Sequence, residues 1–157
     1  SFINNANNAI HHTTEEVTAA LHFKGANLRV TNTEFINNKG KRNSAIYAVG
    51  EAGLLTIDNS QFVENNATDT TVAIYKNAKL TNVRFVSNSG YSDRVAIDIA
   101  NSGVNVEIKD STFIDNGNST EYSIWNTATL KVENNTISNG IGGPEFFFFI
   151  FRIYFNN

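Results

Sequence analysis

Residues 28–38 of this 157-residue chain read LRVTNTEFINN, and the fold follows from this stretch. Leu28 and Val30 alternate with polar residues, which is typical of a strand with one buried face. Asn32 interrupts the alternation and favours a turn, because asparagine tolerates turn conformations. Phe35 then opens a second apolar run that ends in asparagine at position 38. The stretch therefore predicts two short strands joined by a tight turn.

The same pattern recurs along the chain. We call the residue that aligns with Phe35 in each copy the anchor, and successive anchors are 27, 23, 28 and 24 positions apart. The anchors are Phe35, Phe62, Phe85, Phe113 and Ile137. Asparagine or aspartate stands three residues before each anchor, and asparagine stands three residues after the first four. A third apolar run precedes each copy, centred on Leu21, Ile46, Ile74, Ile97 and Ile124. Self-similarity at such a period is the mark of a solenoid.

Three short strands in each repeat of about 25 residues predict an all-β fold, a right-handed parallel β-helix of about five coils. Stacked coils would place the phenylalanine anchors in one interior column, about 4.8 Å apart. The asparagine columns would form ladders at the corners, since stacked amides can hydrogen-bond along the axis and asparagine tolerates left-handed backbone. A leucine-rich repeat is the rival fold, but leucine is scarce and the asparagine spacing does not fit it.

The repeats predict one β-helix domain over residues 1–143, in which residues 6–18 fit no repeat and form a candidate loop insertion. Residues 144–157 form an apolar, phenylalanine-rich tail that we interpret as a cap on the last coil or as an artefact of an interrupted reading frame. A β-helix has open strand edges at its ends, so uncapped coils favour end-to-end self-association.

Composition excludes several functional classes. The chain has no cysteine, which rules out a disulfide scaffold, a cysteine-ligated zinc site and thiol catalysis. Its net charge of −3 argues against a nucleic-acid partner. No run of about 18 apolar residues occurs, so we expect no transmembrane span in this segment. His11 and His12 are adjacent and would diverge on a strand, so no metal site is expected, and no cofactor motif is present.

The repeats resemble those of known surface proteins. Phe35-Ile36-Asn37-Asn38 and its counterparts at the later phenylalanine anchors resemble the FxxN motif of polymorphic outer membrane protein repeats and of adhesin-like β-helix proteins. The likeness covers about residues 20–140, although only the Ala-Ile half of the first family's Gly-Gly-Ala-Ile motif is present. The resemblance implies an adhesin-like, non-enzymatic segment that is extracellular or on the cell surface and needs no cofactor.

A polysaccharide lyase or hydrolase is the main alternative, because β-helices also carry such enzymes. These enzymes need clustered carboxylates, or calcium with a basic residue, on one outer face. Glu64 and Asp115 fall in one predicted column, but two coils, or about 10 Å, should separate them. No third acid converges on them, so we nominate no catalytic residue and prefer a solvated turn. An inert stalk is a further alternative.

One outward column is a candidate binding site. If the aliphatic residue at the centre of each third run points inward, the residue after it points outward. We call this column the binding strip. It consists of His22, Tyr47, Tyr75, Asp98 and Trp125. Exposed aromatic rings beside a carboxylate suit sugar rings or peptides, so the expected partner is a glycan or a surface protein. Ordinary cross-strand stacking of the rings is the alternative interpretation.

Overall fold

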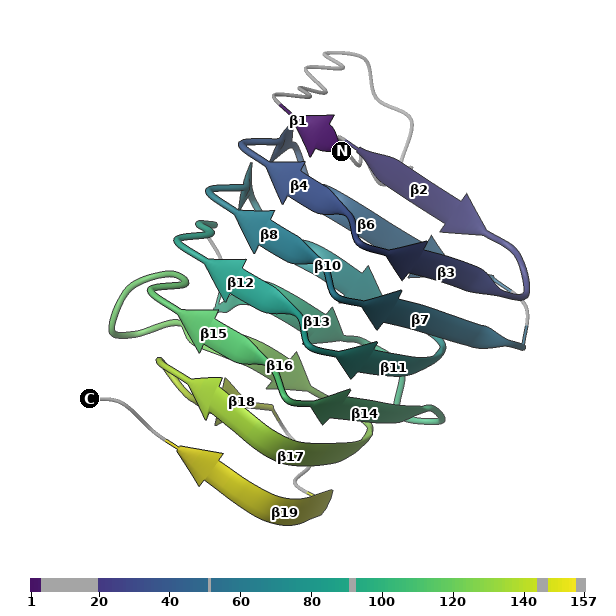
Figure 1. The fold of residues 1–157 in the computed structure, drawn as a ribbon, viewed down its shortest axis with the longest axis vertical. Helices are drawn as coiled ribbons and strands as arrows, with labels where there is room; N and C mark the ends of the chain where they lie inside the picture. The colour runs from purple at the N-terminus through teal and green to yellow at the C-terminus, as the bar shows by residue number, and fades with distance from the viewer. Residues whose placement is uncertain (4–19, 51, 91–92, 144–146, 155–157) are drawn as a thin grey trace.

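The computed structural model describes residues 1–3, 20–50, 52–90, 93–143 and 147–154, and every regular element in these ranges is a β-strand (Figure 1). The predicted loop insertion at 6–18 lies outside the described residues. Successive turns of the chain lie on one another, and all strand pairs named below are parallel. No helix in the described ranges is long and apolar enough to cross a membrane.

Each coil contributes three strands. The first strands, which form a six-stranded sheet, are β2 (Leu21–Lys24), β6 (Asn43–Val49), β10 (Thr70–Ile74), β13 (Arg94–Ile99), β16 (Tyr122–Asn126) and β18 (Ile141–Gly142). The second strands are β3 (Leu28–Thr31), β7 (Leu54–Asp58), β11 (Asn77–Thr81), β14 (Asn105–Lys109) and the start of β17 (Thr129–Ile137). The third strands are β1 (Phe2–Ile3), β4 (Glu34–Ile36), β8 (Gln61–Val63), β12 (Arg84–Val86), β15 (Thr112–Ile114) and the end of β17.

The second and third strands belong to one large sheet, which continues into β19 (Phe147–Tyr154). β5 (Lys39–Gly40) and β9 (Asn66–Ala67) pair with each other on a short fourth side. In Figure 1 the near strands run from right to left and the far strands run back, while the chain descends from β2 to β19. This path is a right-handed coil, the hand that parallel crossovers nearly always take. The predicted right-handed parallel β-helix is confirmed.

The predicted interior column of anchors is also confirmed. The backbone register pairs Phe35 with Phe62, Phe62 with Phe85, Phe85 with Phe113 and Phe113 with Ile137, which spans four turns. The four phenylalanine rings are fully buried, and neighbouring rings stack nearly parallel with centroids 4.4–4.9 Å apart. The ring spacing matches the distance between paired strands, so one repeat per turn places each ring on the next.

The corner before each anchor turns through a left-handed residue. The five residues three positions before the anchors have φ between 48° and 54°. They are Asn32, Asn59, Asn82, Asp110 and Asn134, and we call them the outer column. Asparagine and aspartate adopt this conformation at lower cost than most residues. The side chains in the outer column are largely exposed, and Asn82 Nδ2 donates to Asn59 Oδ1 at 2.8 Å.

The corner after each anchor holds a buried ladder, which we call the inner column. It consists of Asn38, Asn65, Asn88 and Asn116, all at most 1% exposed. In the first three, the side-chain Nδ2 donates to the Oδ1 of the next asparagine, at 2.8–3.0 Å. Asn65, Asn88 and Asn116 also donate to the anchor carbonyl of the coil before, at 2.9–3.0 Å. The predicted asparagine ladder is therefore a fully hydrogen-bonded interior feature, as buried polar groups require.

The end of the solenoid is extended by part of the apolar tail. β19 pairs in parallel with β17, in continuous register from Thr129 beside Phe147 to Thr136 beside Tyr154 except at one position. Residues 147–154 thus add a further rung to the sheet. That the tail caps the stack, or is an artefact, stays a prediction.

Candidate functional site

The binding strip lies on the outer face of the six-stranded sheet, but its register differs from the prediction. His22 pairs with Tyr47, and Tyr47 pairs with Ala73 rather than with Tyr75. The column then continues through Asp98, Trp125 and Gly142. Correspondingly, Val72 and not Ile74 takes the inward place beside Ile46. The predicted position of Tyr75 in the strip is therefore wrong by two residues.

The shift of Tyr75 arises between β6 and β10, whereas Asp98 and Trp125 pair as predicted. The first strands are also irregular in length. Between two paired positions, β6 has one residue more than β10, and β13 has one residue more than β16. Such bulges displace the following residues relative to the neighbouring strand. A slip of two residues leaves inward and outward faces unchanged, so hydrophobic alternation alone cannot detect it.

The first half of the strip is a packed aromatic stack. Tyr47 is only 6% exposed, and its ring meets His22 edge-on at 4.9 Å and Tyr75 edge-on at 5.5 Å. Tyr75 remains beside Tyr47 although it is shifted along the strand. The predicted exposure of Tyr47 is wrong, because its two aromatic neighbours cover its ring. Cross-strand stacking, the alternative interpretation, describes this half of the strip.

The second half of the strip offers a different surface, which we call the Trp125 cluster. It consists of Arg94 and Asp98 on β13 and Tyr122 and Trp125 on β16. The Arg94 guanidinium lies 5.3 Å from the centre of the Trp125 indole and donates to Asp98 Oδ2 at 3.0 Å. The Tyr122 ring lies 5.8 Å from the Trp125 ring. Tyr122 is 39% exposed and Trp125 is half-buried, so both rings are accessible from outside.

Asp98 is the buried member of this cluster, and its predicted exposure is also wrong. Its side chain is 7% exposed, and Oδ1 has no hydrogen-bond partner within the part of the chain that the structure describes. Burial raises the pKa of Asp98 from its ordinary value of 3.8, while the hydrogen bond and the charge of Arg94 oppose this rise. Asp98 thus accepts the Arg94 hydrogen bond from a buried position.

Sequence reasoning missed Tyr122 and Arg94. Tyr122 is three positions before Trp125, and strict alternation along a strand would put such residues on opposite faces. Tyr122 stands at the first position of β16, opposite Arg94 and beside the bulge, which brings both side chains to the indole. Gly142 allows this approach, because a Cβ there would lie 2.5–2.7 Å from the Tyr122 ring.

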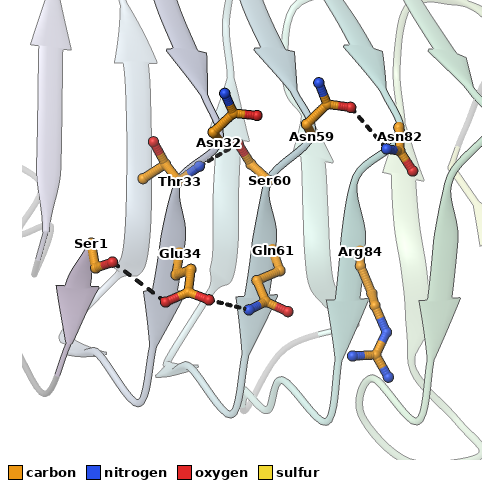
Figure 2. Close-up of a pocket in the computed structure, with 9 residues that line it drawn as sticks. All are labelled: Ser1, Asn32, Thr33, Glu34, Asn59, Ser60, Gln61, Asn82 and Arg84. Carbon is orange, nitrogen blue, oxygen red and sulfur yellow. Dashed lines mark hydrogen bonds between the residues drawn. The ribbon is translucent and has the colours of Figure 1, made fainter.

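Apart from the Trp125 cluster, a polar groove runs across β4, β8 and β12 (Figure 2). Its volume is about 430 Å³. It is lined by Ser1, Asn32, Thr33, Glu34, Asn59, Ser60, Gln61, Asn82 and Arg84. Glu34 accepts a hydrogen bond from Gln61 Nε2 at 2.7 Å, and Arg84 occupies the next rung of the same column. The groove supplies hydrogen-bonding groups but no aromatic platform.

The face of β11, β14 and β17 carries a ladder of paired charges. Glu107 lies between Lys131 at 2.9 Å and Lys79 at 3.9 Å, and Glu133 lies 3.3 Å from Lys109. The hydrogen bond from Lys131 lowers the pKa of Glu107. Opposite charges on neighbouring strands compensate one another here, so this face is a stabilising surface rather than a site with unbalanced charge.

The two carboxylates considered for catalysis, Glu64 and Asp115, lie at turns. Glu64 and Asp115 share one column with Ser87 between them, as predicted, and all three have φ of 53°. These positions are therefore left-handed turn residues. Among the described residues, no group of three histidine, aspartate or glutamate side chains could hold a metal ion.

No protein-family model matches this sequence, and comparisons with curated proteins and with solved structures find no match either.

Proposed function

We propose that this chain is a non-enzymatic, adhesin-like segment of a secreted or cell-surface protein, and that it binds a glycan through the Trp125 cluster. The observation that carries the proposal is the accessible Tyr122–Trp125 pair beside Arg94, which Asp98 holds by a hydrogen bond. Aromatic rings with hydrogen-bonding groups at their edge match the apolar faces and hydroxyl groups of sugars.

The environment of the cluster supports binding with little rearrangement. Asp98 fixes Arg94 at 3.0 Å, and Arg94 lies against the indole. Both strands pair on two sides within the six-stranded sheet, so the backbone beneath the cluster is held by its neighbours. A site whose side chains are already oriented loses less conformational entropy on binding.

The distribution of acidic residues favours binding over catalysis. Glycoside hydrolysis needs two carboxylates that face one another across the scissile bond. In the Trp125 cluster, Asp98 is the one carboxylate, and it is buried beneath Arg94. The cluster therefore presents an aromatic surface without an acid pair, and Asp69, whose charge acts on Asp98, is paired with Arg42 at 2.8 Å.

Fluorescence titration tests the proposal, because Trp125 is the sole tryptophan. We expect a glycan from a broad array to quench or shift its emission, with a saturating dependence on concentration. The variants Tyr122→Ala and Arg94→Ala should weaken the response. Tyr75→Phe is the matched control, since Tyr75 contacts Tyr47 and lies outside the cluster.

Three outcomes would contradict the proposal. Unchanged Trp125 emission across the array, together with unaltered retention of Tyr122→Ala on glycan-coated surfaces, would favour an inert stalk. Capture of a surface protein that survives removal of its glycans would favour a protein partner. Release of sugar fragments from a polysaccharide would indicate an enzyme.

A further inference from the structure

We infer that Asn118 is an acceptor for an N-linked glycan. The chain contains three Asn-x-Ser/Thr sequences, which begin at Asn66, Asn118 and Asn134. This motif is accepted where it lies on the surface of an exported protein. The inference rests on the export that the proposed function includes, but it does not depend on glycan binding by the Trp125 cluster. The three sequences differ in their accessibility and in whether they lie in a strand or a loop.

Asn118, Ser119 and Thr120 are all exposed, and they lie in the loop between β15 and β16, which projects from the stack (Figure 1). The hydroxyl that defines the motif is already directed at the acceptor amide. Thr120 Oγ1 donates to Asn118 Oδ1 at 2.7 Å, and the Thr120 backbone N–H donates to the same oxygen at 2.9 Å. The motif is thus presented as one compact, accessible turn.

The Asn118 amide nitrogen remains chemically available in this turn. One contact involves Nδ2, which donates to Glu121 Oε1 at 2.9 Å. An amide NH₂ has two hydrogens, so one N–H can keep this bond while the other is replaced. In the transfer, Nδ2 forms a bond to C1 of the sugar and loses a proton. The C1–O bond to a lipid diphosphate breaks, and the lipid diphosphate leaves with the electron pair. A lipid-diphosphate-linked oligosaccharide and its transferase supply the reaction.

The sequence at Asn66 is built into the solenoid. Asn66 lies in β9, its backbone N–H donates to Asn38 O, and its Nδ2 donates to Ser89 Oγ at 2.8 Å. Ala67 is 1% exposed. Thr68 Oγ1 bonds to Lys41 O instead of to the Asn66 amide. A transferase could reach this acceptor only after β9 had left its partner.

Asn134 itself is exposed in the outer column, but its motif belongs to a central strand. All three residues belong to β17, and the middle residue, Asn135, is fully buried with Nδ2 bonded to Ile108 O at 2.8 Å. Thr136 pairs with Thr112 on one side and with Tyr154 on the other. Asn134 Nδ2 donates to Asp110 Oδ1 at 3.1 Å. Occupancy here would require disruption of the large sheet.

Expression of the full chain behind a secretion leader in a eukaryotic cell line tests the inference. Glycans are released enzymatically in heavy-oxygen water, which marks each occupied asparagine as labelled aspartate in peptide mass spectra. We expect occupancy at Asn118 several times that at Asn66 or Asn134. Thr120→Ala should abolish the modification, and Thr120→Ser should retain it. Thr68→Ala is the matched control and should leave the glycan signal unchanged.

Vacancy at Asn118, or occupancy no higher than at the other two asparagines, would overturn the inference, provided that a secreted reference glycoprotein is modified in the same cells. This result is independent of glycan binding by the Trp125 cluster, because the Trp125 titration uses protein made in cells without N-glycosylation. Failure of that titration with an occupied Asn118 would contradict the binding role alone.

Discussion

The two corners that flank each phenylalanine anchor both carry a column of asparagines, but asparagine has a different structural role in each column. In the outer column the asparagine itself takes the left-handed conformation, and its side chain is largely exposed. In the inner column the preceding residue takes that conformation, and the asparagine side chain points into the stack. The same residue type therefore supplies backbone tolerance at one corner and a buried amide at the other.

The identity of the left-handed residues supports this difference. Before the four residues of the inner column these residues are Asn37, Glu64, Ser87 and Asp115. Such variety indicates that the backbone turn alone does not require asparagine at that corner. The inner asparagine is required by its amide, because it bonds to the next ladder residue and to an anchor carbonyl, which no other side chain of that shape does. The comparison predicts that substitutions at the two corners will differ in size and in pattern.

The largest effect is expected at Asn88 in the inner column. Asn88→Ala removes the acceptor for the Asn65 backbone N–H and for Asn65 Nδ2, and it removes the donor to Phe62 O. Each buried group left without a partner costs about 1–3 kcal/mol. We therefore expect the free energy of unfolding to fall by at least about 3 kcal/mol, measured by urea denaturation.

Asn88→Gly sharpens this test, since glycine relieves no strain where the asparagine itself is not left-handed. Both variants should be severely destabilised and glycine should offer no rescue. A loss below about 1 kcal/mol for Asn88→Ala would contradict the importance of the ladder, because it would equal one exposed hydrogen bond.

Much of this architecture could be predicted from the sequence, because the anchors and both asparagine columns keep a fixed spacing within a single run of residues. From Leu28 to Asn38 no residue is inserted or deleted in any copy, and this segment spans two strands and one corner. Counting back from Phe62 or Phe113 therefore gives the right partner at every position from the second strand onward.

The candidate site could be predicted only in part, because it lies on the first strand, where the spacing varies. Loops of different length precede and follow this strand, and bulges in β6 and β13 change its register. The repeat pattern predicts the right column for His22, Tyr47, Asp98 and Trp125. The burial of Tyr47 and Asp98 depends on neighbouring side chains that no period describes. Arg94 and Tyr122 reach the indole through the irregular start of their strands.

A smaller effect is expected at Asn82 in the outer column, where φ is 51°. Alanine adopts the left-handed conformation less readily than asparagine does. Asn82→Ala should therefore lower the free energy of unfolding by about 1–2 kcal/mol. Asn82→Gly removes the strain and loses the exposed bond to Asn59, so it should cost less than about 1 kcal/mol.

The decisive measurement at this corner is which of the two variants, alanine or glycine, has the higher free energy of unfolding. Glycine should be better than alanine at position 82, whereas glycine should give no advantage at position 88. Urea unfolding of the four variants under one condition provides the comparison. Equal losses for Asn82→Ala and Asn82→Gly would show that side-chain bonding, and not the backbone turn, selects asparagine in the outer column.

The smallest change in the free energy of unfolding is expected at Asp98. This residue adds a buried carboxylate to the comparison of buried and exposed polar groups. Because burial raises its pKa in the folded protein above the ordinary value of 3.8, the native state keeps this proton to a higher pH than the unfolded state does. The contribution of Asp98 to stability is therefore fully present below pH 3.8 and is lost as pH rises through the folded pKa.

Asp98→Asn removes this titration and leaves the opposite titration of Glu107 in place, so the titration of Glu107 cancels in the difference between variant and parent. Urea unfolding of both proteins between pH 4 and 7 should show the variant gaining stability relative to the parent as pH rises. A difference that stays constant, or that shrinks toward neutral pH, would mean that the Arg94 hydrogen bond outweighs burial at this carboxylate.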